Sequence, residues 1–187
     1  MASTRDRILD ALQDVLLEGG PAGATLDVVA QRAGVSKGGL LYHFRSKDDL
    51  FAGLLDRLAA EAAAADAATP TDPVRAARWF LDGSQTAEGP EERTMLAALR
   101  LLGTYAPAQE RMAAYLDGWA AGLRRTIDDP VLSRLVQLVG DGLFLHALLG
   151  SGDADLDGRV VAQVLDRVAG GDRPGTARPG SDRPGSD

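Results

Sequence analysis

The chain has 187 residues and a mass of 19.6 kDa, which suits one domain or two small domains that share a core. Hydrophobic residues make up 45% and charged residues 25%, and the absence of cysteine excludes disulfides, thiolate catalysis and cysteine metal sites. The formal net charge of −7 does not exclude nucleic acid as a partner, because phosphate contacts depend on local potential rather than on total charge.

Four helices are expected in the first third of the chain. The first has apolar residues at helical spacing and should end at Gly19-Gly20-Pro21. The next three are predicted at Leu26–Ala33, Lys37–Phe44 and from Ser46 to about Asp66. A hydroxyl residue precedes each helix as an N-cap, and the four caps are Ser3 or Thr4, Thr25, Ser36 and Ser46.

The remainder of the chain also has the composition of helices. Valine, isoleucine and threonine are sparse, and no alternating apolar run of strand length occurs. After a Thr- and Pro-containing turn at residues 67–73, helices are predicted near Asp72–Gly83, Glu91–Tyr105, Pro107–Ile127, Pro130–Leu149 and Asp155–Ala169. The sequence therefore predicts an all-α fold of about nine helices.

The end of the chain differs from the rest. The triplet RPG begins at residues 173, 178 and 183, in a segment without any large apolar side chain. Such a segment cannot bury enough surface to offset its ordering entropy, so residues 170–187 are predicted to be a disordered tail.

Composition also bears on location. No charged-then-apolar leader opens the chain, and the most apolar later segment, residues 131–150, carries Arg134, Asp141 and His146. We therefore expect a cytoplasmic protein with no membrane partner.

The stretch AGVSKGGLLYHFRSKDDLF, residues 33–51, contains the only two lysines of the chain, Lys37 and Lys47. Between residues 32 and 47 the cations are Arg32, Lys37, Arg45 and Lys47, with no acid, so the local charge is +4 − 0 = +4. The pattern indicates a small basic patch on an acidic body.

Two short helices joined by a turn with Gly34, inside a basic patch, are typical of a helix-turn-helix. Leu40 and Phe44 can anchor the second helix in the core. The outer face is then left to Ser36, Lys37, Gly39, Tyr42 and His43, with Lys47 added by the start of the fourth helix. Those positions would meet phosphates and base edges in a major groove. Taken singly, Thr25 could be a cap alone and His43 could simply pack at a helix end.

The run TLDVVAQRAGVSKGGLLYHFRSKDDLFAGLL resembles the N-terminal DNA-binding region of the TetR family of bacterial transcriptional repressors. The resemblance covers residues 4–58, and its central motif is Gly-Val-Ser followed by Tyr-His-Phe-x-Ser-Lys. It implies a homodimer that binds a palindromic operator on double-stranded DNA, and release when a small-molecule effector moves the fourth helix. It also implies a helix-turn-helix domain at residues 1–46 and an effector and dimerisation domain at residues 47–169, with helix 47–66 connecting them.

Carried over by position, the resemblance places Thr25, Ser36, Lys37, Gly39, Tyr42, His43 and Lys47 at the DNA. Two positions depart from the pattern, because relatives commonly have Thr where Gly39 stands and Tyr where Leu41 stands. The reading helix therefore lacks one hydroxyl and one aromatic ring, and Gly38-Gly39 weakens it by up to ~1 kcal/mol per glycine relative to alanine.

Large polarizable side chains gather in the second half of the chain. Such a stripe is often ordinary core, but aromatic and methionine side chains also line cavities for flat or apolar ligands. We hypothesise an effector pocket bounded by Trp79, Met95, Leu99, Tyr115, Trp119 and Phe144, with Asp82, Gln85 or Asp141 available to orient a ligand or attract a cation.

The last two predicted helices carry more apolar residues than one chain needs, which favours a dimer. The expected interface residues are Leu135, Val139, Leu143, His146, Val161, Val164 and Leu165, and Gly140 and Gly142 would permit close approach of a partner helix.

Two other classes of protein are alternatives to a DNA-binding regulator, an enzyme and a helical adaptor. An enzyme is disfavoured because the only histidines, His43 and His146, fall in different predicted units, and no HExxH, Gly-x-Ser-x-Gly or phosphate-loop pattern occurs. A helical adaptor that binds only protein would not need the pattern from Ser36 to Lys47. We therefore expect a ligand-responsive DNA-binding repressor with no cofactor, no metal and no catalytic residues.

Overall fold

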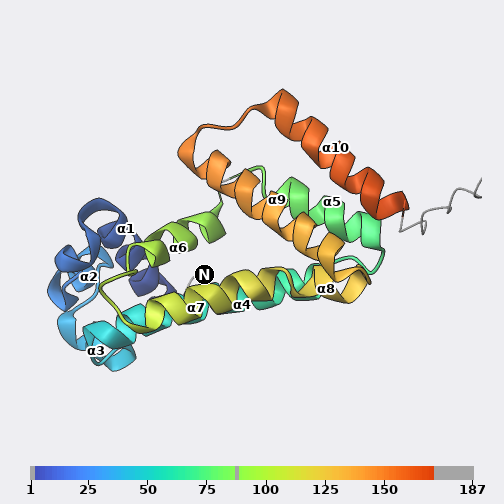
Figure 1. Ribbon diagram of the computed structural model, residues 1–187. Coiled ribbons are helices and arrows are strands. Elements are labelled where there is room, and N and C mark those ends of the chain that lie inside the picture. Colours follow the sequence, from blue (N-terminus) through green and yellow to red (C-terminus); the bar gives the residue numbers. More distant parts are fainter. Residues whose placement is uncertain (1–2, 87–88, 171–187) are drawn as a thin grey trace, which may run out of the picture.

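A computed structural model of the chain describes residues 3–86 and 89–170. The regular structure within these two ranges is helical throughout and comprises ten helices, α1 to α10 (Figure 1). The predicted all-α fold is confirmed. The predicted disordered tail lies outside the described residues, except for Gly170, which ends α10.

The first three helices form a compact unit at one end of the molecule (Figure 1). They are α1 (Thr4–Gly23), α2 (Leu26–Arg32) and α3 (Lys37–His43). Ser3 caps α1 in a reciprocal capping box with Asp6. The helix is broken at Gly20, whose φ of +66° lies in the left-handed region, and a further turn beginning at Pro21 continues to Gly23. The predicted end of the first helix therefore corresponds to a break rather than to its last residue.

Helix α4 (Lys47–Ala68) leaves this unit and runs the length of the molecule beside α7 (Pro107–Trp119) (Figure 1). Ser46 caps α4 by accepting a hydrogen bond from the backbone N–H of Asp49 at 3.0 Å. Because α4 begins beside the short helices and ends near α8, it connects the two ends of the molecule.

The other helices are α5 (Pro73–Gly83), α6 (Pro90–Leu99), α8 (Ala121–Thr126), α9 (Pro130–Leu149) and α10 (Ala154–Gly170). Helix α6 ends earlier than predicted, because residues 100–105 form turns rather than a continuation of the helix. The predicted helix Pro107–Ile127 is divided at Ala120 into α7 and α8. Gly122 in α8 lies so close to Thr69 that a Cβ there would be 2.2 Å from its Oγ1.

Two hydrophobic clusters form the core. One joins α1 to α4 with α6 and α7, and the other joins α5, α8, α9 and α10. Trp119, at the end of α7, packs against both clusters. The two ends of the protein therefore share a continuous interior through this side chain.

Among the described helices, α9 is the one long and apolar enough to cross a membrane by length and composition. A core or interface helix of a soluble protein can pass the same test. Helix α9 carries Arg134 and Asp141, which a membrane-spanning helix rarely holds, and one of its faces packs against α5, α8 and α10.

Candidate nucleic-acid interface and effector pocket

Helices α2 and α3 are joined by a tight turn. Gly34 adopts a φ of +65°, and the Val35 backbone N–H donates to the Ala30 carbonyl at 3.0 Å to close the turn. Leu40 is fully buried and Phe44 is 3% exposed, so both anchor α3 in the N-terminal core. The opposite face of α3 is thereby turned outward.

The two N-cap hydroxyls at this site are exposed. Thr25 Oγ1 accepts from the Val28 backbone N–H at 3.2 Å, and Ser36 Oγ accepts from the Gly39 N–H at 3.0 Å. Each hydroxyl also carries a hydrogen that it can donate to a phosphate oxygen. A cap and a phosphate contact are therefore compatible roles for both residues.

Among the large hydrophobic side chains of the described residues, Tyr42 is the most exposed, at 85% of its maximum. Its ring contacts the ring of His43 edge to face, with centroids 5.1 Å apart, and His43 is also exposed. Gly39 is half-buried behind the Ser36 cap, and a Cβ there would lie 3.3 Å from Ser36 Oγ. Helix α3 therefore presents two adjacent rings, those of Tyr42 and His43, at its C-terminal end.

Two cations of the basic patch are bound to acids from outside it. Lys37 Nζ lies 3.0 Å from Asp27 Oδ2, and the Arg32 guanidinium bonds to both carboxylate oxygens of Glu18 at 2.6 and 2.8 Å. The Arg32 guanidinium holds the pKa of Glu18 below its usual value. The local charge of +4 is therefore partly compensated once the chain is folded.

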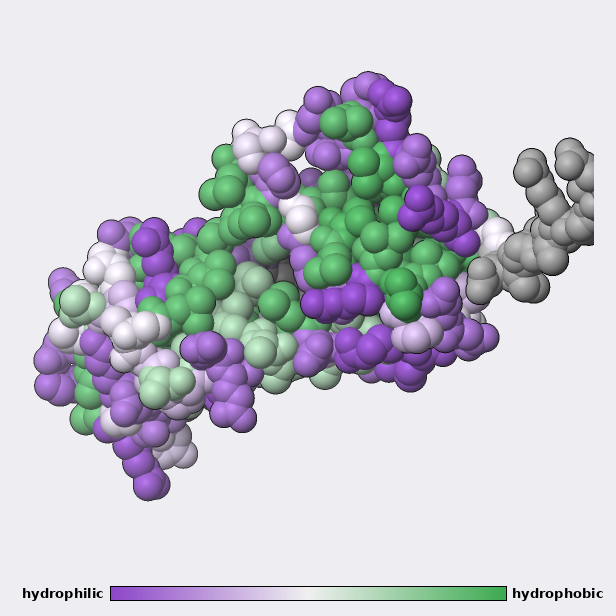
Figure 2. Space-filling model, in the orientation of Figure 1, coloured by the Kyte–Doolittle hydropathy of each residue, from purple (hydrophilic) through white to green (hydrophobic). Residues whose placement is uncertain are grey.

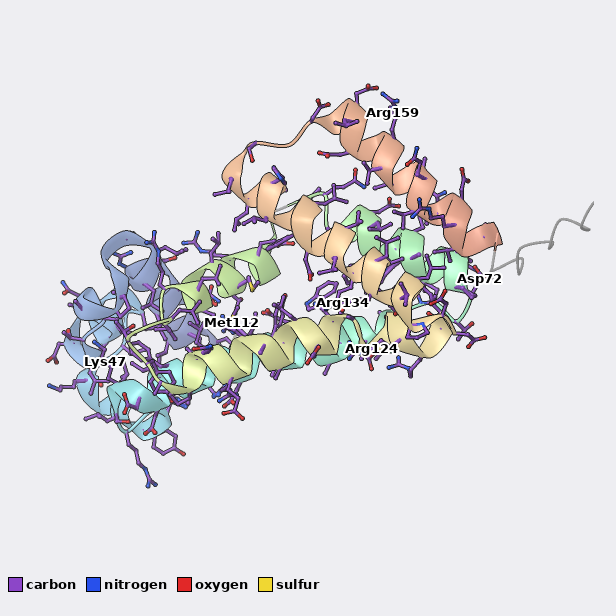
Figure 3. The ribbon with its side chains drawn as sticks, viewed as in Figure 1. Lys47, Asp72, Met112, Arg124, Arg134 and Arg159 are labelled. Carbon is purple, nitrogen blue, oxygen red and sulfur yellow. The ribbon has the colours of Figure 1, made fainter. Side chains whose placement is uncertain are left out.

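Lys47 is half-buried at the start of α4, at the end of the molecule formed by α2 and α3 (Figure 3). Its ammonium donates to the Pro21 carbonyl at 2.5 Å and lies 5.3 Å from the centroid of the Phe51 ring. Pro21 and Phe51 therefore fix the position of the Lys47 ammonium, and the sequence pattern did not predict either contact.

Arg45 is a cation that the sequence-based set of DNA contacts leaves out. It is exposed and lies two residues after the end of α3, and among residues 3–86 and 89–170 its guanidinium forms no ion pair. Lack of an acidic partner leaves its charge available to a phosphate. The absence of acidic residues between positions 32 and 47 was the sequence signal that could have identified Arg45 as a DNA contact.

A cavity of about 60 Å³ lies between α5, α6, α7 and α9. It is lined by Phe80, Gly83, Ser84, Glu92, Met95, Tyr115, Leu116, Trp119, Gly140, Asp141 and Phe144. Of the six residues predicted to bound a pocket, Met95, Tyr115, Trp119 and Phe144 are therefore together at one cavity. Trp79 stacks on Trp119 with ring centroids 5.9 Å apart but does not line the cavity, and neither does Leu99.

Three polar groups of the cavity are unusual. Glu92 Oε2 and Trp119 Nε1 are buried, and neither has a hydrogen-bond partner among the described residues. Burial raises the pKa of Asp141, an effect that the charge of Arg134 partly offsets. The sequence predicts Asp141 as a possible ligand group but does not predict Glu92, because nothing in the sequence distinguishes Glu92 from the surface acids of other helices.

Gly140 explains how α9 approaches α5. A Cβ at this position would lie 2.3 Å from Phe80 Cε1, whereas a Cβ at Gly142 would meet nothing within 4 Å. The close approach expected at Gly140 is therefore made within the protomer, to Phe80 of α5 and to Ser84, the residue after its last turn.

The residues predicted for a dimer interface are divided between two environments. Leu143, Val161, Val164 and Leu165 are buried in the core that α5, α9 and α10 share, whereas Leu135 and Val139 are half-buried. His146 is exposed, and its Nδ1 lies 3.0 Å from Ser151 Oγ. Periodicity alone could not tell which apolar face α5 would cover.

Other apolar side chains of α9 and α10 remain open to solvent, and Figure 2 shows hydrophobic surface over these helices. They are Val131, Leu138, Leu145, Leu149, Leu156 and Val160, with exposures from 37% to 77%. Val131, Leu138 and Leu145 recur every seven residues and so lie along one face of α9. We call these six residues the α9–α10 apolar face.

Known proteins resemble both parts of the chain. Residues 8–54 match the family described as bacterial regulatory proteins, tetR family, and residues 74–169 match the tetracyclin repressor-like C-terminal domain. The HTH-type transcriptional regulator SrpR of Pseudomonas putida is 40% identical over 52 residues, which are 28% of this chain and 24% of SrpR. The HTH-type transcriptional repressor BepR of Brucella suis biovar 1 is 41% identical over 56 residues, which are 30% of this chain and 27% of BepR.

The match to these two regulators thus spans only about a quarter of their length. A likeness over most of the chain comes from a solved structure, the multidrug binding protein EbrR complexed with malachite green. It is 30% identical, covers 88% of this chain and 96% of EbrR, and superposes with a TM-score of 0.67.

Proposed function

The chain belongs to the TetR family of bacterial transcriptional regulators, and on this premise we propose that it is a repressor that binds a palindromic operator as a homodimer and is released by a small, largely apolar or aromatic effector. In this proposal the α2–α3 unit reads DNA in the cytoplasm, the α9–α10 apolar face joins two copies, and the cavity at Trp119 receives the effector.

The outward face of α3 is the observation that carries the DNA-binding role. Tyr42 is 85% exposed on a helix whose other face is anchored by fully buried Leu40. An aromatic side chain so exposed lacks a structural task in the protomer, and it is flanked by His43 and by cations at Lys37, Arg45 and Lys47. Thr25, Ser36 and Gly39 complete the proposed contact surface. Phosphate contacts would fix the register and the α3 side chains would meet base edges.

The α9–α10 apolar face supports the homodimer. Large exposed side chains at a spacing of seven residues are typical of a helix that packs against another helix. A two-fold dimer would place two α3 helices at half-sites about one helical turn of DNA apart, which is why a palindromic operator is proposed.

The solved relatives support the effector. Solved structures of the multidrug binding protein EbrR contain malachite green or ethidium, both of which carry aromatic rings, and EbrR resembles this chain over most of its length. The cavity at Trp119 has aromatic walls suited to such molecules. Its present volume of about 60 Å³ is far below the several hundred Å³ of typical ligand pockets, so binding would have to move neighbouring helices.

Helix α6 is placed to transmit this movement. Glu92 and Met95 line the cavity, while the intervening Arg93 and Thr94 contact Asp14 and Gln13 of α1. Helix α4 packs along α7 and also contacts α6, so a shift of α6 or α7 on ligand binding would move α4 as well. Displacement of either helix would change the separation of the two α3 helices in a dimer.

The DNA-binding role is tested by fluorescence anisotropy with the promoter fragment that flanks the protein's own gene, titrated at rising salt. The proposal predicts saturable binding whose log K falls linearly with log salt, at about −0.9 per phosphate contacted. Lys47→Ala should weaken binding to all sequences, whereas Gly39→Ser should change the preference among them. A helical adaptor or an enzyme that does not bind DNA would give no salt-dependent rise in the anisotropy of the fragment.

A further inference from the structure

We propose that the cavity at Trp119 selects lipophilic organic cations, whose positive charge Glu92 and Asp141 hold and whose apolar body lies against the aromatic walls. This inference rests on the proposed function, because it names the ligand class of the same effector pocket. It is carried by three features of the cavity: its charge, the buried Oε2 atom of Glu92 and its aromatic rings.

The charge of the cavity wall has one sign. Its eleven lining residues include Glu92 and Asp141 and no lysine, arginine or histidine. The wall is otherwise apolar except for the Ser84 hydroxyl, the Tyr115 hydroxyl and the Trp119 N–H. An anion would meet two carboxylates in a site of low polarity, where repulsion is poorly screened. A cation would be attracted by both.

Glu92 supplies an atom that needs a partner. Its Oε2 is buried, and no described residue donates a hydrogen bond to it. A carboxylate oxygen withdrawn from water without a donor or a counter-charge is costly, and nearby Arg93 is bound to Asp14 instead. A cation in the cavity would remove this cost, whereas a neutral hydrocarbon would leave it in place.

The aromatic side chains form the complementary part of the site. The Trp119 ring stacks on Trp79 and meets Phe80 and Tyr115 edge to face, with centroids 6.2 and 6.4 Å away. Phe144 closes the wall from α9. Faces of such rings attract cations, and most strongly where water is excluded. Carboxylates beside stacked rings therefore match a charge spread over an apolar frame.

An ordinary structural explanation accounts for the rings but not for the acids. The rings also pack the junction of the two hydrophobic clusters, so their presence alone would indicate core. Core packing gives no reason to place a carboxylate from α6 and a second from α9 at the same cavity. The combination points to a ligand.

The test uses tetraphenylphosphonium and tetraphenylborate, which have nearly the same size and shape and opposite charge. Binding of each ion to the full-length protein is measured by quenching of tryptophan fluorescence and by calorimetry. Tetraphenylphosphonium should bind at least about tenfold more tightly than tetraphenylborate. Glu92→Gln and Asp141→Asn should each weaken the cation about tenfold and leave the anion unchanged or improved.

Glu110→Gln is the matched control, because Glu110 is an exposed acid of α7 that does not line the cavity. It changes the net charge by the same amount and should leave the selectivity intact. Glu92 and Asp141 lie on different helices and are substituted separately. If one variant fails to fold, the other still tests the proposal. Thermal melting of each variant reports on folding.

Equal binding of the two ions, preference for the anion, or loss of cation binding in Glu110→Gln would overturn the cation selectivity. Absence of binding by either ion would overturn it as well. Operator binding by the unliganded protein is measured in parallel. If the protein binds DNA but does not discriminate between the two ions, the proposed DNA-binding function is supported and only the proposed ligand class is wrong.

Discussion

Gln13 in α1 donates a hydrogen bond through its Nε2 to the Oγ1 of Thr94 in α6, over 2.8 Å and with both side chains buried. The Thr94 hydroxyl in turn donates to Glu61 Oε1 of α4 at 3.1 Å. One hydroxyl therefore joins the DNA-binding unit, the connecting helix α4 and the helix that carries Glu92. A motion of α6 must therefore either break these hydrogen bonds or move α1 and α4 together with α6.

Replacement of Thr94 with valine should lower the free energy of unfolding by ~1–3 kcal/mol. Valine fills the same space but leaves the buried Gln13 amide without its acceptor. Thr126→Val is the control, since the Thr126 hydroxyl bonds only to carbonyls of its own helix, and its loss should cost less than about 1 kcal/mol. Urea unfolding measures both, and equal losses would argue against a special role for the junction.

Asp27→Asn should strengthen binding to DNA. Asp27 holds the Lys37 ammonium at 3.0 Å, and both side chains are mostly exposed, so DNA has to compete with this acid for Lys37. Removing the acid should raise affinity by up to about fivefold, the equivalent of an exposed ion pair of ~1 kcal/mol. Lys37→Ala should weaken binding instead. Anisotropy at fixed salt measures both, and a loss of affinity in Asp27→Asn would show that the pair supports the DNA-binding conformation.

Gly140→Ala should destabilise the fold and distort the cavity. The new methyl group would lie 2.3 Å from Phe80 Cε1 on a buried ring that cannot swing away freely, which costs ~1–3 kcal/mol. Gly158→Ala in α10 is the matched control, because its methyl group would meet nothing within 4 Å, and it should be neutral or stabilising by up to about 1 kcal/mol. Thermal melts compare the two, and similar midpoints would contradict the close packing of α9 on α5.

Asp141→Asn should stabilise the ligand-free protein at neutral pH, and this gain should disappear on acidification. Burial raises the pKa of Asp141 in the folded state above its ordinary value of 3.8, so the charged form is disfavoured by folding. As pH falls through that raised pKa, the folded protein binds a proton before the unfolded chain does, and the wild type gains stability relative to the variant. Urea unfolding of both proteins between pH 7 and pH 4 measures the difference. A constant difference would mean that Asp141 is not desolvated.

Leu145→Glu should dissociate the proposed dimer without unfolding the chain. Leu145 belongs to the α9–α10 apolar face and is 53% exposed, so a charge there is tolerated in a monomer and opposed at an interface. Leu102→Glu is the control, because Leu102 is 42% exposed but belongs to neither α9 nor α10. Sedimentation velocity at micromolar concentration should give monomers for the first variant and dimers for the second. Dimers for both would move the interface elsewhere.

Local chemistry made much of the fold predictable from sequence. Ser36 and Ser46 are hydroxyl residues followed by helix-forming runs, and both cap helices in the structure. The all-α class followed from apolar spacing in the same way. The division of the helix at Ala120 was not predicted, because no proline or left-handed glycine marks this position in the sequence.

The sites were less predictable, because they depend on contacts distant in sequence. Lys37 is compensated by Asp27, and Lys47 is oriented by the Pro21 carbonyl 26 residues earlier. Val161 has the same apolar periodicity as an interface residue, but α5 covers it within the chain. Glu92 is recognisable only after folding brings it to the wall of a cavity that aromatic side chains also line.

The most direct test of the account is to incubate the protein with fragmented genomic DNA from its host and to sequence the fragments that it retains. If two copies place the α3 helices in successive major grooves, a few fragments should be enriched, each with an inverted repeat whose half-sites lie about one helical turn apart. Retention that is lost with Leu145→Glu would tie the repeat to the dimer. Retention without sequence preference, or enrichment of fragments that share no inverted repeat, would contradict the account.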